Sequence, residues 1–238
     1  MITASLTGVR ACVFDAYGTV FDYASAAAKC RAELGDAFEK LNSVWREKQL
    51  HYTWLRTIQG LHVDFQQVTG EALDYALEVV GMTDTALRSR LMTLYFELDC
   101  FPEIPEMLLR LKQIGMKTAI LSNGSPKMLD AVVNNAGLGD LFDAVLSVEE
   151  VGMFKPHRSV YQLAVDRLGV AADAISFQSS NAWDAYAASA FGMRVVWCNR
   201  YRQPHEQLPG APDREIQSLT ELPDLVGAGP AMSPADAR

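Results

Sequence analysis

One short stretch near the start of the chain constrains the fold most. Residues 9–19 begin with an apolar run typical of a buried strand, and that run ends in the carboxylate of Asp15. Gly18 follows within a few positions and permits a tight turn. Ligands of an open α/β sheet bind beyond the carboxyl ends of its strands, so we expect Asp15 to project into a crevice. An aspartate there can also do no more than cap a turn, so the other strand ends decide between these interpretations.

The segment after Thr19 has a helical pattern instead. Its apolar spacing predicts helices at residues 24–34, 38–55, 71–80 and 85–98. Thr69 is a candidate cap for the third of these, and Pro102 and Pro105 end the region. A helical block between a first and a second strand predicts an inserted helical cap domain over the crevice, at residues 20–100.

Strands and helices alternate in the rest of the chain. Strands are predicted at residues 117–121, 142–147, 174–177 and 194–197, the last of them the final strand. Helices are predicted at residues 104–114, 127–136 and 159–168, with a further one ending at Phe191. This alternation predicts an α/β fold with a doubly wound parallel-sheet, Rossmann-like core, built from residues 1–19 and 101–226. Residues 227–238 have no apolar period and are predicted to be a disordered tail.

Composition narrows the class of protein. The 238 residues are 49% hydrophobic and 21% charged, as in a soluble globular protein. The formal net charge of −8 argues against nucleic acid or an acidic membrane as partner, though not against an anionic substrate in a locally positive pocket. Cys12 and Cys198 lie in apolar runs, which favours free buried thiols in a reducing compartment. No signal peptide or membrane-spanning run is evident, so we expect a cytoplasmic protein.

Polar groups stand at four separate strand ends: Asp15; Ser122 with Asn123; Lys155; and Ser179, Ser180 and Asn181 with Asp184. In a parallel sheet these ends lie on one edge, so the groups are expected to converge. Each has an ordinary structural explanation when taken alone. Ser122 can cap a helix, Lys155 can be a solvated loop residue, and Asp184 can face a helix dipole. Their joint occurrence in this order favours an active site.

These four stretches resemble the motifs of the haloacid dehalogenase superfamily. The resemblance spans residues 9–200 and rests on Phe-Asp-Ala-Tyr-Gly-Thr at 14–19, Ser-Asn-Gly at 122–124, Lys-Pro at 155–156 and Ser-Ser-Asn-Ala-Trp-Asp at 179–184. Most members of this superfamily are phosphatases. The last motif and Trp-Arg-Glu-Lys-Gln-Leu at 45–50 are more specifically similar to the (S)-2-haloacid dehalogenases.

The residues help to choose between a phosphatase and a dehalogenase. Phosphatases of the superfamily carry an aspartate two positions after the nucleophile as general acid and as an aid to Mg²⁺ binding, and this chain has Tyr17 there, with an ordinary pKa of about 10. Without a metal, Asp15 would meet a phosphate dianion at a cost of roughly 4 kcal/mol per charge pair at about 4 Å and an effective dielectric of about 20. A 2-haloacid carries one charge, remote from the attacked carbon, and halide leaves without a proton. We therefore expect hydrolysis of short (S)-2-haloalkanoic acids to (R)-2-hydroxy acids, with no cofactor and no metal.

The resemblance implies a role for each motif. Asp15, kept ionised by Lys155, would attack C2 and form an ester, and Asp184 would position or deprotonate the water that hydrolyses it. Ser179 and Asn181 would support Asp184, while Thr19 and Tyr161 would orient Asp15 and Lys155. The substrate carboxylate would bind to Ser122, Asn123 and backbone amides after the first strand, at Ala16 and Tyr17.

The cap is expected to supply the remaining contacts. Arg46 would stabilise the departing halide, unless it is a surface arginine on an amphipathic helix. The apolar wall of the pocket would comprise Tyr17, Leu50, Phe65 and Trp183, although Leu50 and Phe65 also suit a plain core role. Glu47 stands beside Arg46 where the resemblance leads us to expect glutamine, which leaves the preferred substrate open.

Two alternatives remain at this stage. One is a Mg²⁺-dependent small-molecule phosphatase on the same fold, and the other is a non-catalytic relative that binds a partner. The four histidines show no metal-ligand spacing. Resemblance to the family also implies a homodimer.

Overall fold

The computed structural model describes residues 5–227 and contains one six-stranded sheet. The strands are β1 (Ala11–Phe14), β2 (Lys117–Ser122), β3 (Ala144–Ser147), β4 (Ile175–Ser179), β5 (Arg194–Cys198) and β6 (Arg214–Ile216). Their order is β3-β2-β1-β4-β5-β6, and every neighbouring pair is parallel. The doubly wound parallel sheet is confirmed. The expectation that residues 194–197 form the final strand is wrong, because β6 follows as a three-residue edge strand.

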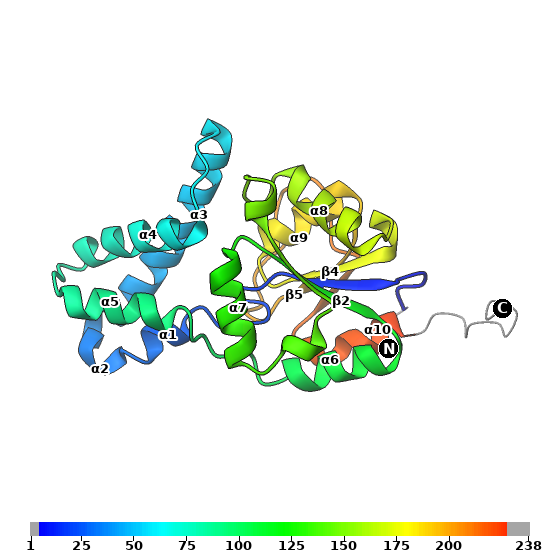
Figure 1. Cartoon of the computed structure of the whole chain (residues 1–238), viewed down its shortest axis with the longest axis horizontal. Coiled ribbons are helices and arrows are strands. Elements are labelled where there is room, and N and C mark those ends of the chain that lie inside the picture. The colour runs from blue at the N-terminus through cyan, green and yellow to red at the C-terminus, as the bar shows by residue number, and fades with distance from the viewer. Residues whose placement is uncertain (1–4, 228–238) are drawn as a thin grey trace, which may run out of the picture.

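Helices cover both faces of the sheet (Figure 1). On one face lie α8 (Arg158–Leu168) and α9 (Ala182–Phe191), and on the other lie α6 (Ile104–Gln113), α7 (Pro126–Asn135) and α10 (Leu222–Val226). Short 3-10 turns occur at η1 (Gly35–Ala37), η2 (Gly139–Leu141), η3 (Val148–Glu150), η4 (Ala172–Ala174) and η5 (Leu219–Glu221). With both faces covered, the two central strands β1 and β4 are buried along their whole length.

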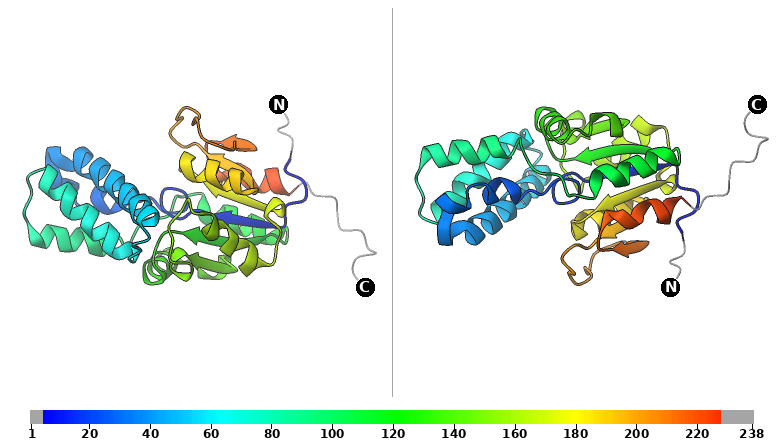
Figure 2. Two further views of the ribbon diagram at one scale, coloured as in Figure 1. Left: turned by 90° about the horizontal axis from the view of Figure 1, so that it is seen from above. Right: turned by 90° about the horizontal axis from the view of Figure 1, so that it is seen from below.

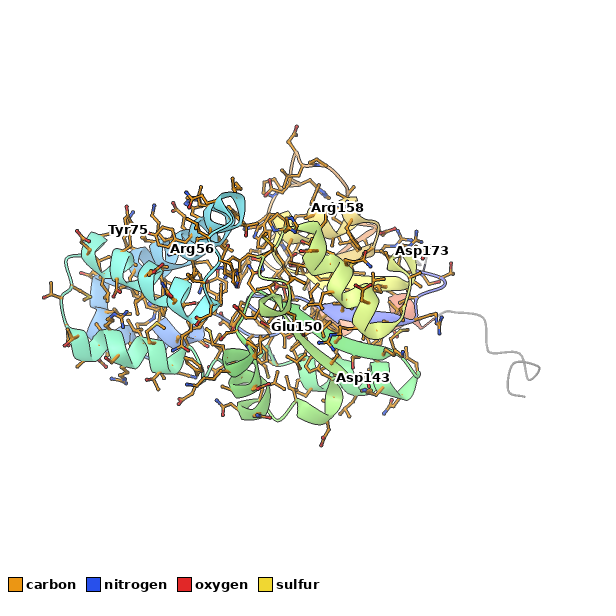
Figure 3. The ribbon with its side chains drawn as sticks, turned by 45° about the horizontal axis from the view of Figure 1, so that its top comes forward. Arg56, Tyr75, Asp143, Glu150, Arg158 and Asp173 are labelled. Atoms are coloured by element: carbon orange, nitrogen blue, oxygen red, sulfur yellow. The ribbon has the colours of Figure 1, made fainter. Side chains whose placement is uncertain are left out.

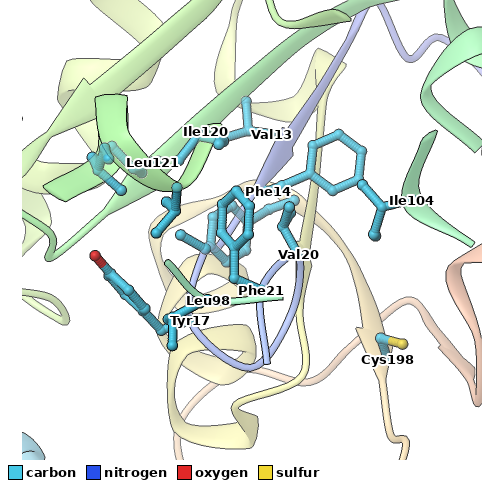
Figure 4. Packing of buried hydrophobic residues seen from close by; sticks show 14 of the residues in the cluster. Val13, Phe14, Tyr17, Val20, Phe21, Leu98, Ile104, Ile120, Leu121 and Cys198 are labelled. Carbon is cyan, nitrogen blue, oxygen red and sulfur yellow. The ribbon is translucent and has the colours of Figure 1, made fainter. Parts of the chain in front are cut away.

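The core is densest around β1. All four residues of this strand are fully buried, and the Phe14 ring meets Phe142 edge-on at 6.2 Å between centroids. Figure 4 shows Phe14 beside Val20, Phe21 and Ile104, which join the sheet to the start of the cap. Each such side chain contributes about 1.5–3 kcal/mol when fully buried. The strand that ends at Asp15 is therefore held rigidly in the middle of the sheet.

Five helices between β1 and β2 form the inserted cap. They are α1 (Ser25–Ala28), α2 (Arg31–Leu34), α3 (Phe38–Gln59), α4 (Phe65–Val79) and α5 (Thr85–Leu94). Figures 1 and 2 show them grouped beyond one end of the sheet. The antiparallel pair α3 and α4 is joined by a hydrogen bond from Trp45 Nε1 to the carbonyl of Thr69, 2.9 Å long. The helical cap predicted between the first two strands is confirmed.

Three details of the cap differ from the sequence-based expectation. Residues 24–34 form two short helices, α1 and α2, because the chain turns at Cys30. Helix α4 begins earlier than predicted, and its cap is Asp64, which accepts from the Gln67 amide at 2.8 Å. Thr69 therefore lies inside the helix, fully buried, and is not a cap. Helix α5 ends at Leu94 rather than residue 98.

Two linkers join cap and core, and they run side by side. Phe101 donates from its amide to the Val20 carbonyl at 3.0 Å, and Asp22 donates likewise to Asp99 at 2.8 Å. Arg200, in the loop after β5, binds residues next to both linkers and so connects the linkers to the core. It donates to the Thr19 carbonyl at 2.9 Å and to Glu103 at 2.5 Å. The domain bounds at residues 20 and 100 stay a prediction, and the predicted tail lies outside the described residues apart from Gly227.

The surface carries the charged side chains. Figure 3 shows Arg56 on the cap and Asp143, Glu150 and Asp173 on the core, spread over the outside of the molecule. The four cysteines are free thiols, and Cys12 and Cys198 are buried as predicted. Burial raises the pKa of Cys12 and of Cys198, which keeps both as neutral thiols. Within residues 5–227 no helix has the length and apolar character needed to cross a membrane.

Candidate active site

Asp15 lies directly after β1, at the centre of the sheet's carboxyl edge. The residue is 6% exposed, and its amide donates to the Gln178 carbonyl of β4 at 2.9 Å. Oδ2 accepts from Asn181 Nδ2 at 2.7 Å, from Thr19 Oγ1 at 3.1 Å and, more weakly, from Ser179 Oγ at 3.4 Å. Among residues 5–227, Oδ1 accepts only from Lys155 Nζ, at 3.1 Å. The donors fix the carboxylate and leave Oδ1 with an unused lone pair.

Lys155 joins Asp15 to a second carboxylate. Its Nζ lies 2.8 Å from Asp184 Oδ2, and Tyr161 donates to Asp184 Oδ1 at 2.7 Å. Lys155 is 1% exposed and Asp184 is fully buried. Burial alone lowers the pKa of Lys155, but attraction to Asp15 and Asp184 outweighs it, so the pKa rises above its ordinary value. The ammonium group therefore stays charged beside Asp15.

The pKa of Asp184 is raised from 3.8 to about 6. Burial is the largest cause and proximity to Asp15 adds to it, while the Lys155 charge and the bonds from Lys155 and Tyr161 act in the opposite direction. Asp184 stands in the first turn of α9, but its carboxylate contacts the cluster and not only the helix dipole. A carboxylate with such a pKa is ionised at neutral pH and still basic enough to accept a proton.

The ring of Tyr17 packs between the carboxyl edge of the sheet and the cap. It contacts Phe65 at 5.4 Å and Tyr95 at 5.5 Å between centroids, and the buried Tyr17 hydroxyl has no partner among the described residues. A Cβ at Gly124 would come within 2.8 Å of that hydroxyl, so only glycine leaves room for it. Burial raises the pKa of Tyr17 well above its ordinary value, with the charge of Tyr95 adding to the effect. Tyr17 is therefore no general acid at neutral pH, as the sequence suggested.

Arg46 reaches from α3 into the site. Its guanidinium donates to Asn181 Oδ1 at 3.2 Å, to the Tyr17 carbonyl at 3.4 Å and to Gln49 Oε1 at 2.9 Å, and it lies 4.6 Å from the centre of the Tyr23 ring. These contacts exclude a plain surface role. Glu47 points away, 54% exposed, with His51 3.7 Å from its carboxylate. The additional negative charge therefore faces solvent and not the guanidinium.

The second motif lies on the other side of Lys155. Asn123 Oδ1 accepts from the Lys155 amide at 2.9 Å, and Ser122 Oγ accepts from the Gly124 amide at 3.0 Å. The Ser122 hydroxyl proton is thus still available to a ligand. Within residues 5–227 the buried backbone N–H groups of Ala16 and Tyr17 also have no acceptor. Unpartnered buried donors of this kind suit a carboxylate ligand.

Of the side chains predicted to form the apolar wall of the pocket, only some lie together at the site. Phe65 is 1% exposed and packs against Tyr17, in agreement with a place at the site. Trp183 instead meets Trp54 edge-on at 5.4 Å and lines an apolar groove of about 650 Å³ between α3 and α9. Leu50 is half-buried on α3, outside the hydrogen-bonded cluster. The wall roles of Trp183 and Leu50 stay predictions.

The donor set does not fit Mg²⁺, the metal of the superfamily's phosphatases. Asp15 and Asp184 are the two carboxylates of the cluster, and both are already paired with the Lys155 ammonium, which leaves too few free oxygen ligands for the ion. The described part of the chain has no group of three or more His, Cys, Asp or Glu side chains placed to hold a metal ion.

Sequence reasoning did not identify the residues that hold Arg46 in place. Gln49, Tyr95 and Tyr23 surround the guanidinium from α3, from the end of α5 and from the first linker. The only local signal is that Gln49 follows Arg46 by three positions on a helix, which places the two on one face.

Comparison with known proteins places this arrangement in a family. Residues 9–192 match the family model of haloacid dehalogenase-like hydrolases, and this range contains every predicted site residue. The chain belongs to the haloacid dehalogenase-like hydrolases. It is 44% identical to (S)-2-haloacid dehalogenase 1 of Pseudomonas sp. (strain CBS-3), over 92% of this chain and 96% of the relative. It is 42% identical to (S)-2-haloacid dehalogenase 4A of Burkholderia cepacia, over 90% of this chain and 93% of the relative.

A solved structure of this hydrolase family has the same architecture. It is the L-2-haloacid dehalogenase of Xanthobacter autotrophicus with chloropropionic acid covalently bound. The TM-score is 0.87 at 37% identity, and the match covers 94% of this chain and 100% of the dehalogenase chain. The superfamily and the dehalogenase branch indicated by the motifs are thus confirmed as the chain's relatives.

Proposed function

We propose that this hydrolase converts short (S)-2-haloalkanoic acids into (R)-2-hydroxy acids through an ester on Asp15. The observation that carries the proposal is the buried cluster of two carboxylates with one ammonium between them, at 3.1 and 2.8 Å. Such a site presents an ionised nucleophile and a second base without a metal. The names of the relatives, (S)-2-haloacid dehalogenases, supply the substrate class.

In the first step Asp15 attacks C2 of the substrate in line. Its Oδ1 is the better placed atom, because Oδ2 already accepts three hydrogen bonds. A bond forms between that oxygen and C2, the carbon–halogen bond breaks, and halide leaves with the electron pair and with inversion at C2. Halide leaves without a proton, so the reaction needs no general acid at the position of Tyr17. Arg46 supplies positive charge where halide charge develops.

The substrate carboxylate binds opposite the cap. Its acceptors meet the Ser122 hydroxyl and the backbone N–H groups of Ala16 and Tyr17, which lack partners among the described residues. Asn123 binds it through its remaining donors, since its Oδ1 already holds the Lys155 amide. These donors keep the substrate charge away from the Asp15 carboxylate during the attack.

In the second step water attacks the ester carbonyl carbon of Asp15. Asp184 accepts one proton from the water, the bond between that carbon and the ester oxygen breaks, and Asp184 returns the proton to the departing oxygen. The hydroxy acid thus leaves with an oxygen that belonged to Asp15, and the regenerated Asp15 carboxyl releases the second water proton to solvent. Tyr161 donates to Asp184 at 2.7 Å rather than contacting Asp15 or Lys155 as expected, so it orients the base, and Lys155 stabilises both carboxylates. Ser179 and Asn181 likewise donate to Asp15 rather than supporting Asp184 as expected, so with Thr19 they hold the Asp15 end of the ester.

The Mg²⁺-dependent phosphatase is not favoured. Tyr17 replaces the carboxylate that such an enzyme uses as acid and metal aid, and the two carboxylates that remain in the cluster are both paired with the Lys155 ammonium. The non-catalytic alternative leaves the buried pair of carboxylates without a purpose, and burying two such charges costs several kcal/mol each.

We also propose that the enzyme is a cytoplasmic homodimer. Apolar side chains are exposed at the end of α3, with Ile58 82% and Leu61 61% exposed, beside the groove lined by Trp54 and Leu208. A second copy covering this apolar surface would remove it from water. The cytoplasmic location rests on a separate observation, the free thiols such as Cys12, which are typical of a reducing compartment. Sedimentation velocity of wild type and Ile58→Asp tests the dimer, and a single monomer peak for the wild type would contradict it.

A single turnover in ¹⁸O-labelled water tests the reaction. With enzyme in excess over (S)-2-chloropropionate, the label should enter the Asp15 carboxylate first, because water attacks the side-chain carbonyl carbon. Mass spectrometry of the Asp15 peptide and of the product follows the label. Label in the first-turnover product would exclude the covalent route, and absence of halide release from any 2-haloacid would exclude the function.

A further inference from the structure

Gln49 lies between the catalytic arginine and the core of the cap. It is 1% exposed, on α3, one turn after Arg46. Its Oε1 accepts from Arg46 at 2.9 Å, while its Nε2 donates to Thr69 Oγ1 at 2.9 Å and to Tyr95 Oη at 3.0 Å. The amide thus connects the guanidinium to helices α4 and α5 of the cap. No other side chain described on α3 bridges Arg46 to both helices.

Hydrogen-bond polarity fixes the orientation of this amide. Thr69 Oγ1 donates its one proton to the Phe65 carbonyl at 2.7 Å, and a carbonyl can only accept. Toward Gln49, Thr69 must therefore accept, so Nε2 faces Thr69 and Oε1 faces Arg46. A guanidinium can only donate, so the reverse orientation would place two donors against each other. The threonine on α4 thus determines which end of Gln49 meets the arginine.

The acceptors around Arg46 are all uncharged. They are Gln49 Oε1, Asn181 Oδ1 and the Tyr17 carbonyl, and among residues 5–227 Arg46 forms no ion pair with a carboxylate. The guanidinium is therefore held in place without being neutralised. A carboxylate at position 49 would hold it equally well but would cancel most of its field at short range.

We propose that Gln49, oriented by Thr69, is a positioning residue that presents Arg46 to the departing halide with its charge unpaired. The proposal rests on the proposed dehalogenation, and it adds a requirement: the partner of Arg46 must be polar and neutral. Glutamine meets both conditions, since it accepts from the guanidinium and carries no charge. Glutamate fails the second condition and methionine fails the first.

Leaving-group dependence tests this proposal. Gln49→Glu and Gln49→Met should each lower kcat for (S)-2-chloropropionate by about 10–100-fold, the usual effect of losing a charge-assisted contact, with a smaller change in KM. The loss should be several times smaller for (S)-2-bromopropionate, because the larger bromide ion depends less on the arginine. A role confined to cap folding would lower both substrates equally. Equal losses for the two halides would overturn the proposal.

A threonine pair gives a matched control. Thr69→Val removes the acceptor that orients Gln49 and should shift the chloride-to-bromide ratio in the same direction as Gln49→Met. Thr53→Val alters an equally buried threonine whose hydroxyl donates only to the Leu50 carbonyl of its own helix, at 2.7 Å, and should leave the ratio unchanged. A wild-type ratio in Thr69→Val, or the same shift in Thr53→Val, would contradict the assignment.

Chloride binding to the resting protein separates this proposal from the proposed function. Broadening of the chloride NMR signal should weaken in Gln49→Glu and Thr69→Val but not in Thr53→Val. That result would support the arrangement around Arg46 even if no haloacid were turned over. Unchanged broadening in both Gln49→Glu and Thr69→Val would overturn it, whatever the wild type does to haloacids.

Discussion

Asp184→Asn should separate the two steps of the reaction. Asp184 accepts from Lys155 on one oxygen and from Tyr161 on the other. The amide can keep its oxygen toward Lys155 and turn its nitrogen toward the Tyr161 hydroxyl, which is able to accept, so the local packing survives. Lys155 keeps Asp15 as a charged partner at 3.1 Å, so the nucleophile remains ionised. Alkylation of Asp15, with its release of halide, should therefore be largely retained.

Hydrolysis of the ester should be lost. Once Asp15 is esterified, Asp184 is the remaining carboxylate of the cluster, and no other group there can take its place as base. A positioned general base contributes about 10²–10⁴-fold, which corresponds to about 2.7–5.5 kcal/mol of the barrier. The steady-state rate should fall by a factor in the upper part of that range, because the site is buried and excludes bulk water as a substitute.

Rapid-quench measurement of halide, with mass spectrometry of the Asp15 peptide, provides the assay. The variant should release one halide per site in a burst and then turn over slowly, with the substrate's carboxyalkyl unit retained as an ester on the Asp15 peptide. Asp143→Asn is the matched control, since Asp143 is also paired with a lysine, Lys112, but lies far from the site. A burst reduced as much as the steady state, with no ester on Asp15, would refute the assignment of Asp184 to hydrolysis.

Four further outcomes are expected. Asp15→Asn should abolish halide release with an unchanged far-UV spectrum, and substantial turnover in freshly made protein would favour direct attack by water at C2. The hydrolysis rate should fall tenfold per pH unit once Asp184 takes up a proton and is lost as a base. The pKa of Asp184 is about 6 in the resting site and is lower in the ester, which lacks the Asp15 charge; a flat single-turnover profile down to pH of about 4 would contradict this. Gly124→Ala should reduce activity about 10–100-fold, because the added methyl meets Tyr17 Oη at 2.8 Å and must displace the ring; activity within about twofold of wild type would show that the ring has room to move. Turnover of haloacids should be unchanged by excess EDTA and by added Mg²⁺, and restoration by Mg²⁺ of an EDTA-inhibited enzyme would revive the phosphatase.

The sequence predicts this fold where the signal is local. The apolar run before Asp15 and the strand-to-polar transitions at Ser122 and Ser179 mark three neighbouring strand ends, so their convergence follows from parallel topology alone. Strand β6 escapes prediction because three residues at an edge, Arg214–Ile216, have too little apolar period to be detected. The preference of Ser and Thr for cap positions predicts Thr69 as a helix cap, yet its hydroxyl contacts Gln49 inside the cap, and this tertiary contact determines its role.

The residues of the site also divide into those with a local sequence signal and those placed by tertiary packing. Lys155, Tyr161 and Asp184 are predictable because each belongs to a motif or follows one closely. The contacts of Arg46 with Gln49 and Tyr95 depend on how three cap helices pack, which no spacing within one helix records. The position of Trp183 was the least predictable, since its neighbour Asp184 points into the cluster while the indole packs on Trp54 at the outer groove.

The paired linkers have a consequence for how such an enzyme can be re-engineered. The cap leaves the core beside Val20 and returns beside Phe101, with the two crossings hydrogen-bonded to each other. It is therefore a single continuous insert whose two ends lie side by side. Another cap can replace it without changing the path of the chain through the core. Nucleophile, ammonium group and hydrolytic base would stay behind, while Arg46 and Phe65 would travel with the insert. A chimera between two relatives should thus inherit its chemistry from one parent and its choice of acid from the other.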